Sequence, residues 1–344
     1  MAKATINDVA ALAEVSIKTV SRVVNGEPNV SGATRDRVER AIAKLNYRPN
    51  PSARNLASDR ARLIGLIYDD PSAWKIPSAG YVIRMQDGAL RACKASNYEL
   101  LIHPCNYRGR TVCDELRTLI EQFRPGGIVI AAPLSNMPRI VDAVAETGTP
   151  LVQLSPGGKP GGHYSVSTND REVAAEMTRY LASLGHERIA FIKGHRKHRA
   201  VAGRWEGYLE GLSTAGLPFA ENLVAQGDNS FGAGEACGEM LLRLRQRPTA
   251  IFAANDDMAA GVIRMADRLG IRIPDELSVA GCDDIALAQQ VYPALTTIRL
   301  PFAEMAERAA TALISRSRRE PGLAGDETIA ASLIVRDSTG PVRA

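Results

Sequence analysis

Short apolar runs alternate with segments of helical periodicity from Arg62 onward, and this alternation occurs twice. The first series contains RLIGLIYDD, YELLIHPC, GGIVIAAP and PLVQLS, with helices predicted over 80–95, 111–123 and 137–146. The second contains RIAFIKG, TAIFAAND and LSVAGCDD, with helices predicted over 170–184, 200–215 and 257–269. Apolar strands separated by helices are typical of parallel sheets covered on both faces. Two such series predict two similar α/β lobes, divided near the Gly- and Pro-rich segment SPGGKPGGH.

The first 45 residues have a different pattern, which fits three short helices. Thr5 and Asp8 form a capping box in TIND, and Ile6, Val9, Ala10 and Ala13 follow at helical spacing. Ser16 caps a second helix and Ser31 a third. Two helices joined by a tight turn, with a third in support, predict an all-α helix-turn-helix unit.

The second helix, in VSIKTVSRVVNG, places Lys18 and Arg22 four residues apart on one face. Like charges at this spacing repel, so a polyanion that binds both would explain them. Residues 1–60 hold ten Lys and Arg against six Asp and Glu, and this excess of four equals the net charge of the whole chain. A basic excess confined to this small module predicts that the module binds DNA. The alternative is a solvated helix with two incidental cations.

The N-terminal end of a recognition helix enters the major groove first, so Ser16, Ile17, Lys18 and Thr19 are predicted to approach bases or phosphates. Lys18 can donate to guanine, Ile17 can contact a thymine methyl group, and Arg22 can reach a base or a phosphate.

The segment YRPNPSARNLAS follows the third helix, which Pro49 and Pro51 are predicted to end. Asn50 can cap a very short further helix, with Pro51 at its first position. One or two turns with almost no apolar face are not stable alone. We therefore interpret this segment as a linker that orders conditionally.

Several classes of protein are disfavoured by the composition. No apolar run approaches the length of a transmembrane helix, and Asp8 and Glu14 interrupt any apolar core of a signal peptide, so a cytoplasmic location is expected. The five cysteines form no C-x-x-C pair, which argues against a disulfide framework or a zinc site. His195 and His198 lack convincing further metal ligands. We expect neither a metal nor another cofactor.

The stretch TINDVAALAEVSIKTVSRVVNGEPNVSGATRDRVERAIAKLNYRPNPSARNLAS resembles the DNA-binding headpiece of the lactose-repressor (LacI/GalR) family. The resemblance continues through IGLI, GHERIAFI, RWEGY, ANDDMAAG and LSVAGCDDIALAQQVYPALTTIR. It implies a homodimer, a minor-groove hinge helix over 50–58, and a two-lobed effector domain like periplasmic sugar-binding proteins. Leu56 then matches an apolar wedge that opens a base step. The implied DNA-binding set is Thr5, Ser16, Ile17, Lys18, Thr19, Ser21, Arg22, Asn25, Ser31, Thr34, Asn50, Ala53 and Leu56.

The resemblance also implies an effector site at strand ends. Arg204 in RWEGY matches the cleft arginine of the family, while Asn255 and Asp283 follow TAIFAA and LSVAGC. Arginine, amide and carboxylate groups that converge suit a neutral polyol better than a polyanion. For each taken alone, a helix cap or an ion pair that stabilises a lobe is an equal alternative, and we assign such a structural role to Asp256, Asp257 and Asp284.

The chain departs from the family pattern at several cleft positions. Asn229 stands where an aromatic residue is common, so Phe231 is expected to supply a stacking face, and Leu300 replaces a glutamine found in several relatives. Tyr81 and Trp74 are candidate aromatic walls in a segment that is longer than usual. His198 aligns with a further cleft position. The predicted effector-binding set is Arg204, Asn255, Asp283, Tyr81, His198 and Phe231.

These features predict a sequence-specific regulator of transcription, most readily a repressor of carbohydrate-utilisation genes that a sugar releases. A purine-type corepressor is the alternative ligand, and a sugar-binding or sugar-processing protein the alternative class. The acidic pairs at 69–70, 256–257 and 283–284 suggest glycosidase carboxylates, but adjacent residues rarely converge and no other catalytic motif is present, so we expect no enzyme. The predicted domains are a headpiece (1–48), a hinge (49–61) and an effector and dimerisation domain (62–344). Within the last, the first lobe is predicted over 62–162 and 293–325, the second over 163–292 and 326–344.

Overall fold

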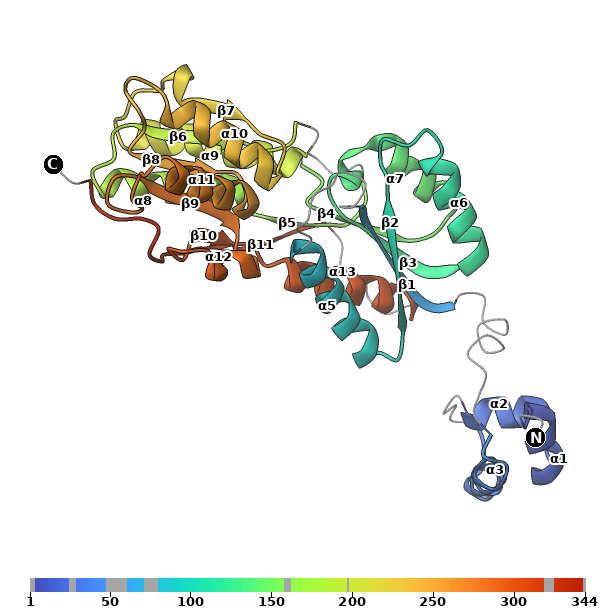
Figure 1. Cartoon of the computed structure of the whole chain (residues 1–344). Coiled ribbons are helices and arrows are strands. Elements are labelled where there is room, and N and C mark those ends of the chain that lie inside the picture. The colour runs from blue at the N-terminus through green and yellow to red at the C-terminus, as the bar shows by residue number, and fades with distance from the viewer. Residues whose placement is uncertain are drawn as a thin grey trace. The chain divides into compact units, whose positions relative to one another are not determined.

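The computed structural model of the chain describes residues 4–24, 29–47, 61–70, 80–157, 162–196, 198–318 and 325–342. The chain divides into two compact units, Met1–Ala61 and Arg62–Ala344, whose elements are labelled in Figure 1. In the parts of the chain that the structure describes, no helix is long and apolar enough to span a membrane.

The N-terminal unit contains helices α1 (Ile6–Ala13), α2 (Ile17–Val24) and α3 (Gly32–Leu45). Their apolar faces meet in a small core, in which Val9, Val20 and Val38 are fully buried. The helix-turn-helix prediction is confirmed. The third helix ends at Leu45, within the 45 residues in which three helices are predicted. The residue that ends it is Asn46, which adopts a left-handed conformation (φ 47°), and not one of the two prolines.

The first sheet of the larger unit has the strand order β11-β5-β4-β3-β1-β2. Its strands are β1 (Ala61–Asp69), β2 (Glu99–Cys105), β3 (Pro125–Ile130), β4 (Leu151–Leu154), β5 (Ser165–Thr168) and β11 (Asp326–Ile329). The helices that accompany it are α5 (Gly80–Ala95), α6 (Val112–Phe123), α7 (Pro138–Ala145) and α13 (Phe302–Ser317), with a 3-10 turn at Leu134–Asn136. The pairings β1/β2, β3/β4, β4/β5 and β5/β11 are all parallel.

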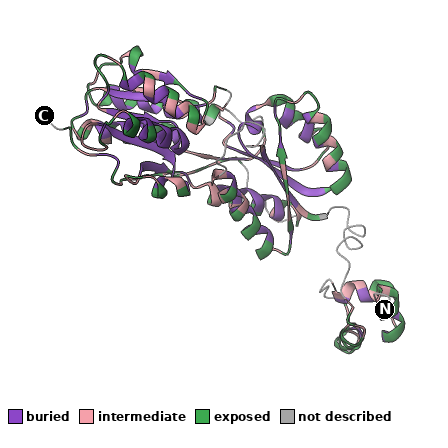
Figure 2. Ribbon diagram, in the orientation of Figure 1, coloured by how far each residue is buried: buried purple, intermediate pink, exposed green. Residues whose placement is uncertain are grey.

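The second sheet has the order β12-β10-β9-β8-β6-β7. Its strands are β6 (Ile189–Lys193), β7 (Val224–Gln226), β8 (Ala250–Ala253), β9 (Ser278–Asp283), β10 (Thr296–Arg299) and β12 (Ser332–Ile334). Its helices are α8 (Asp170–Ser183), α9 (Arg199–Thr214), α10 (Phe231–Leu242), α11 (Asp256–Arg268) and α12 (Ala286–Gln290), with a 3-10 turn at Glu221–Leu223. The pairings among β6 to β10 are parallel, and β12 pairs antiparallel with β10. Figure 2 shows the strands of this sheet buried between helices with exposed outer faces.

The chain passes between the two sheets after β5, after β10 and after β11. This corrects the predicted lobe boundaries at three places. Residues 163–168 lie with the first sheet because β5 pairs with β4, and residues 326–329 join it because β11 pairs with β5. Residues 296–299 lie with the second sheet because β10 pairs with β9. Strand periodicity alone does not tell which of two sheets a strand joins.

The helix α13 follows the second crossing and packs closely on α5 of the first lobe. A Cβ atom on Gly88 would lie only 1.8 Å from the carbonyl oxygen of Ala303, so the two helices contact through backbone at that point. The close packing on α5 holds α13 in the first lobe. Phe302 and Met305, at the start of α13, line the space between the lobes.

Candidate functional site

Hydroxyl groups cap the helices of the N-terminal unit. The Thr5 Oγ1 accepts from the Asp8 amide and the Thr5 amide donates to Asp8 Oδ2 at 2.7 Å, which is the predicted capping box. These hydrogen bonds lower the pKa of Asp8. Ser16 Oγ accepts from the Thr19 amide at 3.1 Å, and Ser31 Oγ accepts from the Thr34 amide. Each helix therefore begins at a fixed residue.

The N-terminal end of α2 forms an exposed surface. Ser16, Ile17 and Lys18 are exposed, and Ile17 retains 51% of its accessible surface, while Val20 and Val23 on the opposite side are buried. Thr19, Ser21 and Arg22 are partly buried beside them. The structure thus places these predicted DNA-binding residues on one helix. Asn25, Asn50, Ala53 and Leu56, and the predicted hinge helix over 50–58, lie outside the described residues. Of the predicted hinge domain (49–61), the structure describes Ala61, which is the first residue of β1.

A cavity of about 540 Å³ lies between the two lobes of the larger unit, and we call it the interlobe cavity. Its lining from the first lobe includes Asp69, Tyr81, Met85, Tyr107, Arg108, Ala131, Ala132, Pro133, Leu154 and Ser155. Its lining from the second includes His195, His198, Val201, Arg204, Asp228, Asn229, Phe231, Asn255, Asp257 and Asp283. Most of these residues lie at or just beyond the carboxyl ends of strands, as expected for an open parallel sheet. All six predicted effector residues line it.

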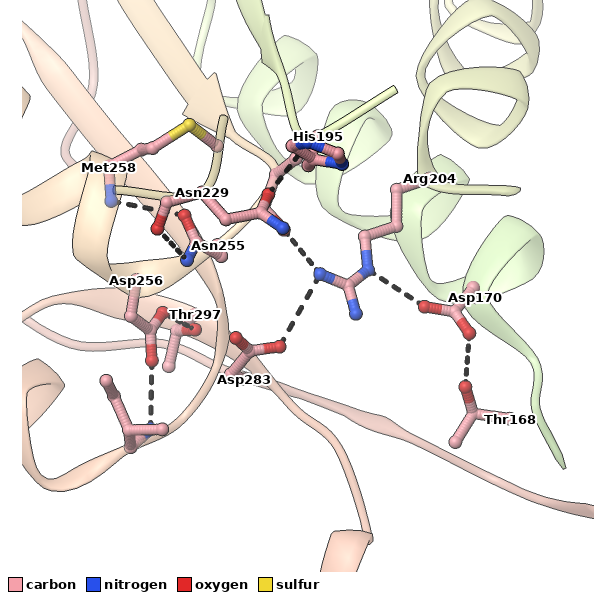
Figure 3. Close-up of polar contacts among 12 residues, drawn as sticks. Thr168, Asp170, His195, Arg204, Asn229, Asn255, Asp256, Met258, Asp283 and Thr297 are labelled. Atoms are coloured by element: carbon pink, nitrogen blue, oxygen red, sulfur yellow. Dashed lines mark hydrogen bonds and ion pairs between the residues drawn. The ribbon is translucent and has the colours of Figure 1, made fainter. Parts of the chain in front are cut away.

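Arg204, on α9, is buried and held at three points (Figure 3). Its Nε donates to Asp170 Oδ1 at 2.8 Å, and its Nη1 donates to the Ala254 carbonyl and lies 3.5 Å from Asp283 Oδ1. Asp170 also accepts a hydrogen bond from Thr168. These contacts fix the guanidinium plane and leave Nη2 as the part of the fork available to a ligand. Asp170 is not in the predicted effector set, although its place at the start of a predicted helix was a signal for it.

Asp283 and Asp284, although adjacent, have different surroundings. Asp283 ends β9 with a positive φ of 121° and lines the cavity. Burial raises the pKa of Asp283, and the positive charge of the Arg204 guanidinium acts in the opposite direction and lowers it. Asp284 instead forms ion pairs with Arg299 at 2.7 Å and Arg336 at 2.5 Å. Buried Asp256 accepts from Thr297 and from the Ile285 amide. Asp256 and Asp284 thus have the expected structural contacts, whereas Asp257 also lines the cavity.

Asn255 is the N-cap of α11. Its Oδ1 accepts from the Met258 amide at 3.1 Å, and its Nδ2 donates to the Asn229 carbonyl at 2.9 Å. Both functional groups therefore support the protein's own structure, and one Nδ2 hydrogen is left for a ligand.

Asn255 variants separate these two roles. We expect Asn255→Ser to keep the cap and remain close to the parent in stability, whereas Asn255→Ala loses about 1 kcal/mol. Thermal unfolding measures the stability. Equal stabilities for the two variants would show that the Met258 hydrogen bond contributes nothing to α11.

His198 precedes α9 and contributes a buried ring nitrogen to the cavity. Its Nδ1 has no hydrogen-bond partner within the described residues. Burial, helped by the positive charge of Arg204, lowers the pKa of His198 to about 3, so the folded protein holds this ring neutral at pH 7. A neutral imidazole offers one donor and one acceptor.

The lowered pKa of His198 predicts a loss of stability in mild acid. The unfolded chain binds a proton at this histidine below its ordinary pKa of 6.5 and the folded chain does not, so unfolding becomes easier as the pH falls from 6.5. One such group contributes up to about 2 kcal/mol between pH 6.5 and pH 5. We expect the melting temperature of His198→Asn to fall less than that of the parent between pH 6.5 and pH 5. The control is His103→Gln, on strand β2, whose melting temperature should fall as much as that of the parent. An equal loss in all three proteins would contradict the effect.

Aromatic and apolar side chains form the remaining walls. Tyr81 on α5 and Phe302 on α13 approach with ring centroids 5.9 Å apart, and Phe231 lines the opposite lobe with Arg264 5.8 Å from its ring centroid. Leu300, in the place of the family's glutamine, adds apolar surface. Trp74 lies outside the described residues.

Hydrogen bonds between described residues join the lobes around the cavity. Arg108 Nη2 donates to His195 Nε2 at 2.9 Å, the Arg199 amide donates to Asn136 Oδ1 at 3.1 Å, and Arg84 donates to the Asp284 carbonyl. Within the described ranges no group of three metal-ligating side chains is present.

Comparisons with known proteins match both units. A model described as bacterial regulatory proteins, lacI family, matches residues 5–50, and one described as a periplasmic binding protein-like domain matches residues 178–339. The HTH-type transcriptional repressor PurR of Vibrio atlanticus (strain LGP32) is 32% identical over 316 residues, which cover 91% of this chain and 92% of that protein.

Two solved structures resemble the chain over nearly its whole length. The lac repressor dimer bound to operator and the anti-inducer ONPF has a TM-score of 0.84 at 27% identity, covering 98% of this chain and all of that one. The complex of the transcriptional regulator CelR with cellobiose has a TM-score of 0.74 at 28% identity, covering 97% and 99%.

Proposed function

The chain belongs to the lacI family of bacterial regulatory proteins, and from this premise we propose a transcriptional repressor of carbohydrate-utilisation genes whose operator affinity is lowered by an uncharged sugar in the interlobe cavity. The observation that carries the proposal is the fixed Arg204 fork beside the Asp283 carboxylate on one wall of a cavity of about 540 Å³.

The proposed DNA contact is made by α2. Exposed Ser16, Ile17 and Lys18 form its leading end, and the basic excess of residues 1–60 supplies the attraction to phosphate. The caps at Thr5, Ser16 and Ser31 fix the helix ends that approach the backbone, with Thr34 beside the last of them. Contacts by Asn25, Asn50, Ala53 and Leu56 belong to the same proposal, which assumes a homodimer on a two-fold operator.

The proposed ligand contact pairs hydroxyl groups with donors and acceptors on the second lobe. Arg204 Nη2 donates, Asp283 accepts, and the neutral His198 ring adds a partner of either kind. Tyr81, Phe231 and Phe302 present ring faces or edges to the apolar faces of a sugar. The resemblance to a regulator solved with cellobiose supports a sugar over a purine.

The proposed switch is a change in the preferred arrangement of the lobes. A ligand shifts such an equilibrium only by binding one arrangement more tightly than the other. The cavity touches both lobes, and the hydrogen bonds Arg108–His195 and Arg84–Asp284 connect the lobes in the arrangement that the structure has. A typical coupling of about 1–3 kcal/mol changes operator affinity about 5–150-fold.

The test begins by selecting an operator from random DNA with the full chain. Labelled operator is then titrated with protein in the presence of neutral mono- and disaccharides, purine bases and buffer alone. We expect at least one sugar to weaken operator binding and to raise the melting temperature of the free protein. Strengthened binding by a purine would replace the sugar with a corepressor, and turnover of a sugar would contradict a purely regulatory role.

A further inference from the structure

Asn136 belongs to the first lobe, and its side chain bonds to both walls of the interlobe cavity. It lies in the 3-10 turn that follows β3 and is 8% exposed. Its Nδ2 donates to the Ser155 carbonyl at 2.9 Å, and its Oδ1 accepts from the Arg199 amide at 3.1 Å. Ser155 is on the first-lobe wall, and Arg199 is the first residue of α9 in the second lobe. One side-chain amide therefore connects the two lobes beside the cavity.

These two partners require an asparagine-like side chain. A carbonyl oxygen only accepts and a backbone amide only donates, so the nitrogen of Asn136 faces Ser155 and its oxygen faces Arg199. An ionised aspartate would keep the contact with Arg199 and lose the donor to Ser155. An alanine would lose both contacts.

The start of α9 needs an acceptor of this kind. The first amides of a helix have no carbonyl partner within the helix, and His198, the N-cap residue, makes no side-chain cap hydrogen bond to a described residue. Asn136 supplies from the first lobe the acceptor that a capping side chain usually supplies from its own chain segment. A Cβ atom on Gly157, also in the first lobe, would overlap the Cβ of Arg199. The first lobe thus packs directly on this helix end.

The helix that Asn136 caps carries groups that line the cavity. Val201 and Arg204 lie in the first two turns of α9 and line the second-lobe wall. A hydrogen bond is lost when its donor and acceptor separate beyond about 3.5 Å. The contact between Asn136 and Arg199 therefore favours the arrangement of the lobes that the structure has over any in which the start of α9 moves away.

We propose that Asn136 is a cross-lobe positioning residue: it caps α9 from the first lobe and thereby couples the position of the ligand-lining helix to the arrangement of the lobes. The inference rests on the proposed function in taking the interlobe cavity as the ligand site. A lost helix cap changes an equilibrium about 2–30-fold. We expect a change of this size in the balance between arrangements when the Asn136 amide is removed.

The first test compares Asn136→Ala and Asn136→Asp with Ser135→Ala in the full chain. Ser135, in the same turn, is 3% exposed and donates to the Leu154 carbonyl at 2.7 Å within the first lobe. Its replacement removes a buried hydrogen bond without touching α9. Hydrogen exchange of the Arg199 amide should be about 2–30-fold faster in Asn136→Ala, and close to the parent in Ser135→Ala and in Asn136→Asp, which keeps the acceptor. Equal exchange in the parent and Asn136→Ala would overturn the cap.

A thiol at a second contact between the lobes reports their arrangement. Ile285, in the second lobe, is 3% exposed, and a Cβ atom on Gly80, at the start of α5, would lie 2.9 Å from the Ile285 Cβ. The first lobe therefore covers this side chain. Ile285→Cys is made with the partly exposed Cys113 changed to serine, since the other native cysteines are buried. The rate of modification of the new thiol by N-ethylmaleimide is then measured.

We expect Asn136→Ala to raise this rate about 2–30-fold and Ser135→Ala to leave it unchanged, whatever each does to the melting temperature. A role of Asn136 in stability alone would change the melting temperature and not the ratio of the two rates. Equal rates in the two backgrounds would overturn the cross-lobe role.

Operator binding separates this inference from the proposed function. If the arrangement of the lobes sets operator affinity, Asn136→Ala changes that affinity without any effector and Ser135→Ala does not. A raised thiol rate with unchanged operator affinity would support the cross-lobe cap and contradict the proposed switch. Unchanged exchange and thiol rates would overturn the cap and leave the proposed function standing.

Discussion

Asp283→Asn is expected to bind its operator as the parent does and to lose most of the response to the effector. The substitution removes a buried carboxylate that faces the cavity 3.5 Å from Arg204, while Asp170 still holds the guanidinium at 2.8 Å. A hydrogen bond to a charged group contributes about 1.5–3 kcal/mol, so effector affinity should fall about 10–150-fold. The variant should therefore repress without being released.

The choice of asparagine follows from the backbone. Asp283 has a φ of 121°, a backbone conformation that is strained for most residues but is adopted more often by asparagine and aspartate. Alanine has no side-chain hydrogen bond to compensate for this strain, whereas asparagine keeps the shape and the local hydrogen bonding of aspartate. Asp283→Ala is a useful second variant, expected to be less stable but equally unresponsive. Asp284→Asn is the matched control, because it disrupts the ion pairs to Arg299 and Arg336 and should lower the melting temperature instead.

Operator titrations with and without the effector decide the assignment. An unchanged effector response in Asp283→Asn would falsify the role of this carboxylate. Loss of operator binding without effector would instead show that Asp283 supports the fold, and the comparison with Asp284→Asn would then show both changes acting through stability.

Local sequence patterns predicted most of the elements because their causes are local. Thr5 and Asp8 form a capping box whatever the rest of the chain does, and the six helices predicted in the two lobes begin and end within two residues of the observed bounds. Two long helices, α10 and α13, were not predicted. The GAGEACG stretch of α10 is rich in small residues that give little apolar periodicity.

Pairing between distant segments could not be predicted. The strand β11 joins β5 across more than half of the larger unit, and nothing in four alternating residues specifies that partner over the second sheet. The predicted lobe boundaries were wrong for this reason. Asp170 could not be predicted for the same reason, because its contact with Arg204 depends on how α8 and α9 pack.

Motifs at strand ends predicted only in part which side chains line the cavity. The strand-end position of Asn255 and Asp283 was enough to predict that polar groups gather at one edge of the sheet. A helix cap was an equal alternative for Asn255, and its carbonyl oxygen does cap α11. The motif did not predict that Asp257 rather than Asp256 lines the cavity. One residue along a helix turns a side chain by about 100°, so the backbone decides which of two adjacent carboxylates meets a ligand.

Lys18→Ala is expected to lose operator affinity by about 1–3 kcal/mol per half-site and to relax base preference at one position of each. Lys18 is exposed at the leading end of α2, where a side chain meets the base edges of the major groove. The proposed homodimer carries two copies of Lys18, so the loss applies twice. Lys44→Ala removes the same charge from the exposed last turn of α3 and serves as the control.

Binding-site selection with the parent and both variants, followed by titration over a range of salt, separates base reading from phosphate contact. If Lys18 reads a base, the selected consensus of Lys18→Ala loses one position in each half-site, while that of Lys44→Ala matches the parent. If Lys18 contacts only phosphate, affinity falls equally on all sequences and the salt dependence drops by about one counterion per half-site. An unchanged consensus would therefore leave base reading to Ile17, the exposed apolar side chain beside it.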